Sequence, residues 1–103
     1  MISREGHFDV QLTVADAFRL SGEALIVIGA RIRVRDRVAG RLVAETPWSL
    51  KSWGESIQVA VGGADGAASV SVRIESKMST TLLDWGQSAD NMQRFGDWLT
   101  KAS

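Results

Sequence analysis

The stretch Glu55–Ser76, ESIQVAVGGADGAASVSVRIES, contains two runs of alternating side chains around a glycine-rich pentapeptide. Its apolar alternate positions are Ile57, Val59, Val61, Val70, Val72 and Ile74. A period of two is typical of a strand that buries one face, and residues 62–66, GGADG, have the composition of a turn. The stretch therefore predicts two antiparallel strands, over 55–61 and 67–76, on one sheet.

The segment before this stretch predicts a second hairpin. ARIRVRD (30–36) alternates apolar and basic residues, and RLVAET (41–46) follows after RVAG, with Gly40 at the corner. Pro47 ends the second of these strands because it has no N–H for the ladder.

The N-terminal part changes period at Thr13. Residues 7–12 alternate as a strand. After Thr13, apolar and small residues follow one face of a helix: Val14, Ala17, Phe18, Ser21, Leu25 and Ile28. Thr13 suits the N-cap and Gly29 the left-handed C-terminal position. We expect residues 1–5 to be flexible.

The C-terminal part predicts a helix from Trp85, with Asp84 and Gln87 as its capping box. Its apolar face comprises Ala89, Met92, Phe95, Gly96, Leu99 and Ala102. The predicted fold is one α+β domain over 1–103 in the order β-α-β-β-β-β-α: an antiparallel five-stranded sheet with two helices packed on one face.

This order resembles the TATA-binding-protein-like arrangement, which is related to the helix-grip architecture. The tail SKMSTTLLDWGQSADNMQRFGDWL, with the preceding SWGESI, resembles small uncharacterised bacterial domains. In these domains a strand ending in Ser-Arg or Ser-Lys precedes an Asp-x-Gly-x-x-x-Asn turn into the last helix. The matching positions here are Ser76, Lys77, Asp84, Gly86 and Asn91. The resemblance implies a fold and no reaction.

Composition excludes several classes of protein. Twelve basic residues balance twelve acidic ones, so no overall field attracts nucleic acid or membrane. No cysteine is present, which removes disulfides and thiolate metal sites. The longest apolar run, ALIVIGA (24–30), is too short to span a bilayer, and the N-terminus lacks the apolar core of a secretory signal. We expect a cytoplasmic protein without a metal, a cofactor or a membrane partner.

The one histidine does not predict catalysis. Asp9 lies on the same strand face as His7 and could orient it, but the sequence shows no nucleophile motif beside them. No acyl-transfer or phosphate-loop motif occurs elsewhere. We therefore expect a protein that is not an enzyme.

Arginines concentrate in the hairpin at Arg31, Arg33, Arg35, Arg37 and Arg41. Strict alternation would set the first three in a row on one strand face. Such a basic face, formed by Arg31, Arg33, Arg35 and Arg41, would suit phosphates or an acidic partner. Alternatively, it is a solvated face paired with Glu45 and Glu75. The absence of stacking aromatics argues against nucleic acid.

Two similar strings, SWGES (52–56) and DWGQS (84–88), each contain a tryptophan. They are not a repeat, because the first enters a strand and the second a helix. We expect Trp48, Trp53 and Trp85 to gather at one end of the sheet. There they could form a lid over a small apolar ligand or a homodimer contact, or, as is more common, plug the core.

These patterns favour a non-enzymatic binding domain, with protein–protein contact or homodimerisation as the first hypothesis. The alternative is a carrier of a small apolar ligand, held in a slot between the last helix and the sheet. Nucleic-acid binding is the weakest alternative. The candidate ligand or interface residues are Trp48, Trp53, Trp85, Met92, Phe95 and Trp98.

Overall fold

The computed structural model of the chain describes residues 2–46, 54–76 and 82–102. Its elements are β1 (Ile2–Val10), α1 (Val14–Val27), β2 (Arg31–Asp36), β3 (Arg41–Glu45), β4 (Glu55–Ala64), β5 (Ala67–Ser76) and α2 (Leu82–Ala102). The order β-α-β-β-β-β-α confirms the predicted one.

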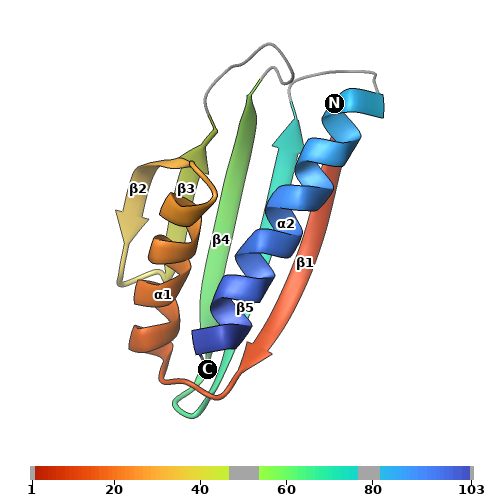
Figure 1. The fold of residues 1–103 in the computed structure, drawn as a ribbon. Coiled ribbons are helices and arrows are strands. Elements are labelled where there is room, and N and C mark those ends of the chain that lie inside the picture. Colours follow the sequence, from red (N-terminus) through yellow and green to blue (C-terminus); the bar gives the residue numbers. More distant parts are fainter. Residues whose placement is uncertain (1, 47–53, 77–81, 103) are drawn as a thin grey trace.

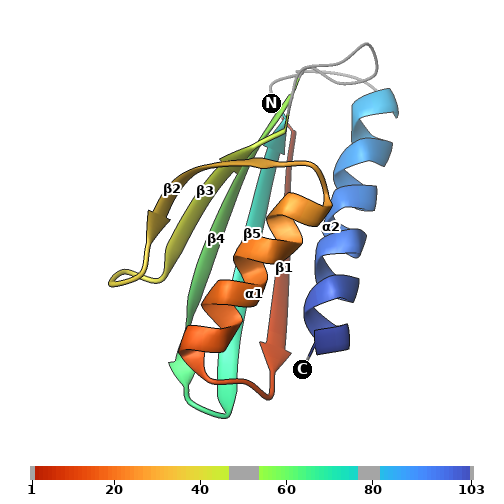
Figure 2. The same ribbon diagram turned by 60° about the vertical axis from the view of Figure 1, so that its left-hand side comes forward.

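The five strands form one sheet in the order β1-β5-β4-β3-β2, and every neighbouring pair is antiparallel. Both helices lie on the same face of this sheet, with α2 on the side of β5 and β1 and α1 beside it (Figure 1 and Figure 2). The opposite face carries no helix among the described residues. This arrangement confirms the predicted α+β fold.

The core lies between the helices and the sheet. The alternate positions of β4 and β5 that predicted a buried face are buried, and Ala17, Phe18 and Leu25 of α1 cover them together with Phe95 and Leu99 of α2. Apolar burial of this kind is the main stabilising contribution in a small domain.

Both ends of α1 are as predicted. The Thr13 hydroxyl accepts a hydrogen bond from the Asp16 N–H at 3.0 Å. At the other end Gly29 has a φ of +86°, and the Ala30 N–H donates to the Leu25 carbonyl at 2.9 Å. This is the pattern of a Schellman motif, in which glycine adopts the left-handed conformation without strain.

Two strands are longer than the alternation predicted. β1 begins at Ile2, so residues 2–5, which we expected to be flexible, pair with β5. The inward positions Arg4 and Gly6 carry no apolar signal that would have extended the strand. β4 continues to Ala64, so the turn to β5 is only Asp65 and Gly66.

The start of α2 also differs from the prediction. The helix begins at Leu82, so Asp84 lies inside its first turn and is not the N-cap. Pro47 lies outside the described residues. Within those residues, neither helix has the length and apolar character needed to cross a bilayer.

Candidate functional site

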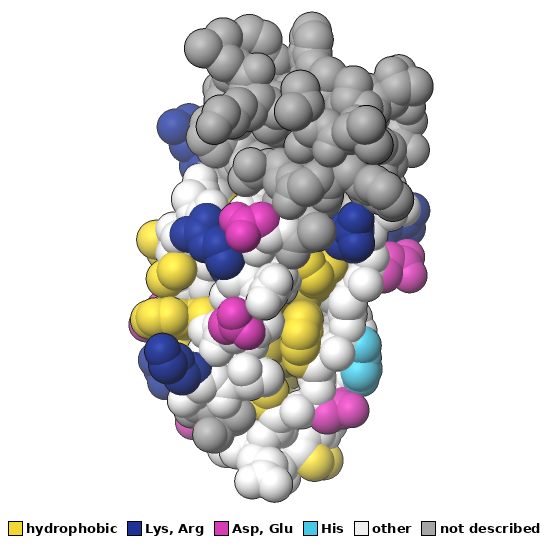
Figure 3. Space-filling model, turned by 45° about the vertical axis from the view of Figure 1, so that its right-hand side comes forward, with side chains coloured by type: hydrophobic (Ala, Val, Ile, Leu, Met, Phe, Trp, Pro, Cys, Tyr) yellow, Lys and Arg dark blue, Asp and Glu magenta, His cyan; other side chains and the backbone are white. Residues whose placement is uncertain are grey.

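A groove runs between α2 and β1 on the surface of the molecule. Its volume is about 390 Å³, and hydrophobic side chains are visible along it in Figure 3. It is lined by Arg4, Glu5, Phe8, Met92, Gln93, Gly96, Asp97 and Thr100. Phe8 and Met92 supply its apolar surface, and the other side chains of the lining are polar or charged.

Two glycines let α2 approach β1 closely at this groove. A Cβ on Gly96 would lie 2.5 Å from Cε1 of the Phe8 ring, and a Cβ on Gly6 would lie 2.6 Å from the Met92 sulfur. Each glycine therefore faces a large apolar side chain of the other element. Phe8 occupies the space that a side chain on Gly96 would need, and Met92 occupies the space that a side chain on Gly6 would need. These two contacts determine the shape of the groove.

Core side chains fill the space between α2 and the sheet next to the groove. Phe95 and Leu99 are fully buried, and the Phe95 ring packs against Phe8 with centroids 6.0 Å apart and planes tilted by 44°. Of the predicted slot residues, Met92 is half-buried in the groove and Phe95 belongs to the core. A ligand at this place would lie along α2 instead of deep under it.

A buried polar pair joins α2 to β4. The Asn91 Nδ2 donates to the Glu55 carboxylate at 2.6 Å, and both residues are almost completely buried. The Glu55 N–H donates to the Thr46 hydroxyl at 2.8 Å. A buried carboxylate needs donors such as the Asn91 amide. Asn91 was singled out by resemblance alone, and its link to Glu55 across 36 positions had no signal in the sequence.

Most of the predicted tryptophan cluster lies outside the described residues. Trp48 and Trp53 lie outside the described residues, as does the side chain of Trp85. Trp98 lies on α2 with 37% of its surface exposed. The expected proximity of Trp53 and Trp85 stays a prediction.

The predicted row of Arg31, Arg33 and Arg35 is wrong. The register of β2 against β3 shifts between Ile32 and Val34, so Arg33 is an extra residue. A bulge of this kind reverses the alternation that follows it.

The shift separates the arginines. Arg31 lies opposite Glu45, whereas Arg35 lies opposite the buried Leu42. The Arg35 guanidinium consequently lies beside Gly22 of α1. Arg33 forms an ion pair with Glu45 at 3.4 Å, which agrees with the solvated interpretation of this face.

His7 has a neighbour that the sequence motif search missed. The register places it opposite Ser71, and its Nδ1 lies 3.3 Å from the Ser71 hydroxyl. Its Nε2 lies 3.0 Å from the Asp9 carboxylate. Only pairing of β1 with β5 brings these residues together, so no local pattern could have found Ser71.

Exposure and strand geometry distinguish this Ser-His-Asp trio, as far as the described residues go, from a hydrolase site. The side chains of His7 and Asp9 are 55% and 81% exposed. β5 lies between β1 and β4, so its backbone N–H groups are used in the ladders and point along the sheet. They are not oxyanion donors for an acyl group on Ser71. No cluster of three or more His, Asp or Glu side chains suited to a metal ion occurs in the described part of the chain.

No protein-family model matches the chain, and no curated protein matches it in sequence. Solved structures do share its fold. One is the crystal structure of Ara h 8.0201, with a TM-score of 0.70 and 10% identity over 95% of this chain and 94% of that chain. Another is the di-domain ARO/CYC BexL from the BE-7585A biosynthetic pathway, with a TM-score of 0.70 and 15% identity over 98% of this chain and 46% of that one.

A third is TTHA0849 from Thermus thermophilus, with a TM-score of 0.50 and 9% identity over 99% of both chains. At these identities the likeness concerns the fold alone. The chain has a helix-grip-like fold. The finer resemblance to small bacterial domains stays a prediction.

Proposed function

We propose that this protein is a non-enzymatic, cytoplasmic binding domain for a small, mainly apolar ligand, which lies in the groove between α2 and β1. The observation that carries the proposal is the pair of apolar side chains, Phe8 and Met92, in the lining of a groove of about 390 Å³. That volume is near the lower end of ligand sites, which start at about 300 Å³.

The lining defines the chemistry of the ligand. The Phe8 ring and the Met92 thioether offer flat and polarisable apolar contact. Gln93 in the lining offers hydrogen bonds, and the Thr100 hydroxyl, which donates to the Gly96 carbonyl at 2.8 Å, can accept one. A ligand with an apolar body and one or two polar groups at its edge would match both parts.

Fluorescence titration with the neutral apolar dye N-phenyl-1-naphthylamine tests this proposal. We expect saturable binding, with at least a tenfold loss of affinity in Met92→Gln. Val34→Gln is the matched control, because Val34 is an exposed apolar residue on β2, far from the groove. Circular dichroism should show that both variants keep the fold. Absence of saturable binding, or full affinity in a folded Met92→Gln, would exclude the groove as the site.

Protein–protein contact or homodimerisation is the second candidate, and the outer surface of the helices favours it. Ile26 and Val27 at the end of α1 are 60% and 43% exposed, and Trp98 of α2 is also partly exposed. The Arg94 guanidinium donates to the Val27 carbonyl at 2.9 Å, which ties the two helices together beside these residues. Exposed apolar residues that adjoin one another can form a contact surface.

Sedimentation velocity over a concentration series tests self-association. A dimer that dissociates in Ile26→Ser and persists in Val34→Ser would support a contact through the helices. A monomer at every concentration would exclude homodimerisation.

A further inference from the structure

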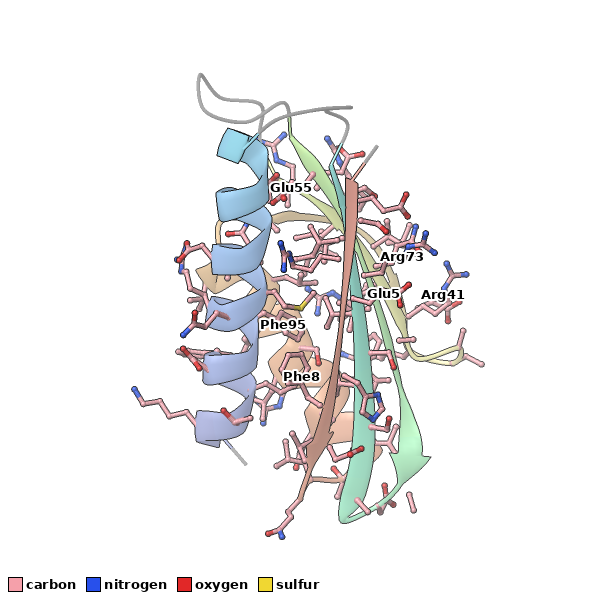
Figure 4. All side chains as sticks on the ribbon, turned by 90° about the vertical axis from the view of Figure 1, so that its right-hand side faces the viewer. Glu5, Phe8, Arg41, Glu55, Arg73 and Phe95 are labelled. Atoms are coloured by element: carbon pink, nitrogen blue, oxygen red, sulfur yellow. The ribbon has the colours of Figure 1, made fainter. Side chains whose placement is uncertain are left out.

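The sheet face opposite the helices carries an open depression of about 480 Å³. It is distinct from the groove, because its side chains project away from α2. Figure 4 shows Arg41, Arg73 and Glu5 on this outer side of the sheet, whereas Phe8 and Phe95 lie between the sheet and α2. Arg41, Gln58, Arg73, His7 and Glu5 contribute to its lining.

The strand register explains why this place is hollow. Arg41 lies opposite Ala60, Ala60 opposite Ser71, and Ser71 opposite His7. One row across four strands therefore has long side chains at its ends and small ones at its centre. The neighbouring row places Gln58 opposite Arg73. The result is a flat floor of Ala60 and Ser71 with taller polar walls.

The two arginines differ in their partners. The Arg73 guanidinium lies 3.3 Å from the Glu75 carboxylate and 3.9 Å from that of Glu5, which holds it in place. Within the described part of the chain Arg41 has no ion pair. Its cross-strand neighbour Asp36 uses its carboxylate to accept the N–H groups of the following turn at 3.0 and 3.1 Å.

Arg41 and Arg73 are two strand spacings apart across the sheet and two residues apart along the strands, which together place their Cα atoms about 12 Å apart. Both side chains are long enough to approach a common group above Ala60. Guanidinium groups bind carboxylates and phosphates with paired hydrogen bonds, and their aliphatic stems provide apolar walls.

We propose that this depression binds an organic anion, namely a carboxylate or phosphate attached to a flat apolar body. The anionic group pairs with Arg41 and Arg73, and the flat body rests on Ala60 and Ser71. His7, oriented by Asp9 and Ser71, forms the far wall.

Backbone amide NMR titrations with benzoate and with phenyl phosphate test the proposal. We expect saturable shifts at Gln58, Ala60 and Ser71 with at least one of the two anions, and the tighter one identifies the anionic group. Arg41→Gln and Arg73→Gln should each weaken binding at least fivefold. Arg19→Gln is the control, because it removes the same charge from an exposed position on α1.

Benzamide, the uncharged analogue of benzoate, should produce no saturable shift at these amides. Met92→Gln should leave the anion affinity unchanged, which separates this site from the groove. The proposal is overturned if neither anion gives saturable shifts. Anion affinity that stays at the parent level in folded Arg41→Gln and Arg73→Gln would overturn it as well.

Discussion

At the residue scale, small side chains shape this molecule as much as large ones do. Gly96 and Gly22 are both buried glycines in helices, where alanine ordinarily forms helix better by about 1 kcal/mol. Their surroundings differ. A Cβ on Gly96 would meet the Phe8 ring, whereas a Cβ on Gly22 would meet only the far end of the Arg35 side chain, 2.8 Å away.

Gly96→Ala should therefore destabilise the protein, since overpacking a core costs about 1–3 kcal/mol. Gly22→Ala should be neutral or stabilising by up to about 1 kcal/mol, because the arginine can move. Urea denaturation measures both. Phe8→Leu should reduce the loss caused by Gly96→Ala in a double-mutant cycle. An equal effect of the two alanines would contradict the close contact at Gly96.

The buried pair of Glu55 and Asn91 gives a second prediction. Asn91→Ala removes a donor from a buried carboxylate, and a hydrogen bond to a charged group contributes about 1.5–3 kcal/mol. The free energy of unfolding should fall by about that amount. Gln93→Ala, on the exposed side of the same helix, should have little effect. Chemical denaturation of both variants makes the comparison.

At the element scale, β2 is an edge strand that is interrupted by its own bulge. Its residues Arg31 and Arg33 carry charge, and the register against β3 shifts between Ile32 and Val34. Charges and bulges on an edge hinder pairing with another chain. Protection of the edge would account for Arg31 and Arg33 without a nucleic-acid partner.

Replacement of Arg31 and Arg33 by threonine should promote association, because threonine favours strands and carries no charge. Static light scattering at increasing protein concentration should rise above that of the parent protein. Arg41→Thr is the control, since β3 already has a neighbour on each side. A double variant that scatters no more than the control would show that the edge needs no such protection.

Element types were predictable, and their irregularities were not. The alternation in β4 and β5 predicted the buried face, because only one face of the sheet is covered by helices and apolar side chains are buried on that face. The bulge at Arg33 was not predictable, because apolar and charged residues alternate without interruption in RIRVRD. Only the pairing with β3 shows the shift in register. The start of β1 was not predicted, because its inward positions Arg4 and Gly6 have no apolar side chain. The pairs His7 with Ser71 and Glu55 with Asn91 depend on long-range contacts, which no local pattern contains.

At the scale of the whole molecule, one continuous core lies between a single sheet and a single layer of helices. The strands are linked through neighbouring ladders from β1 to β2. Loss of either helix would expose the same core. A domain of this kind is expected to unfold as one cooperative unit.

Thermal unfolding followed by circular dichroism and by tryptophan fluorescence should therefore give one coincident transition. Circular dichroism reports on the helices and the sheet together, while fluorescence reports on the surroundings of the tryptophans. Two separated transitions would mean that part of the chain unfolds independently of the shared core.

The pairing of β1 with β5 has a consequence for folding during synthesis on the ribosome. Phe8 pairs with Val70, so β1 finds its partner strand only after about sixty further residues have been made. At about 5–20 residues per second, this strand waits for several seconds. During that interval its apolar side remains uncovered, and nascent-chain chaperones have their best opportunity to bind it.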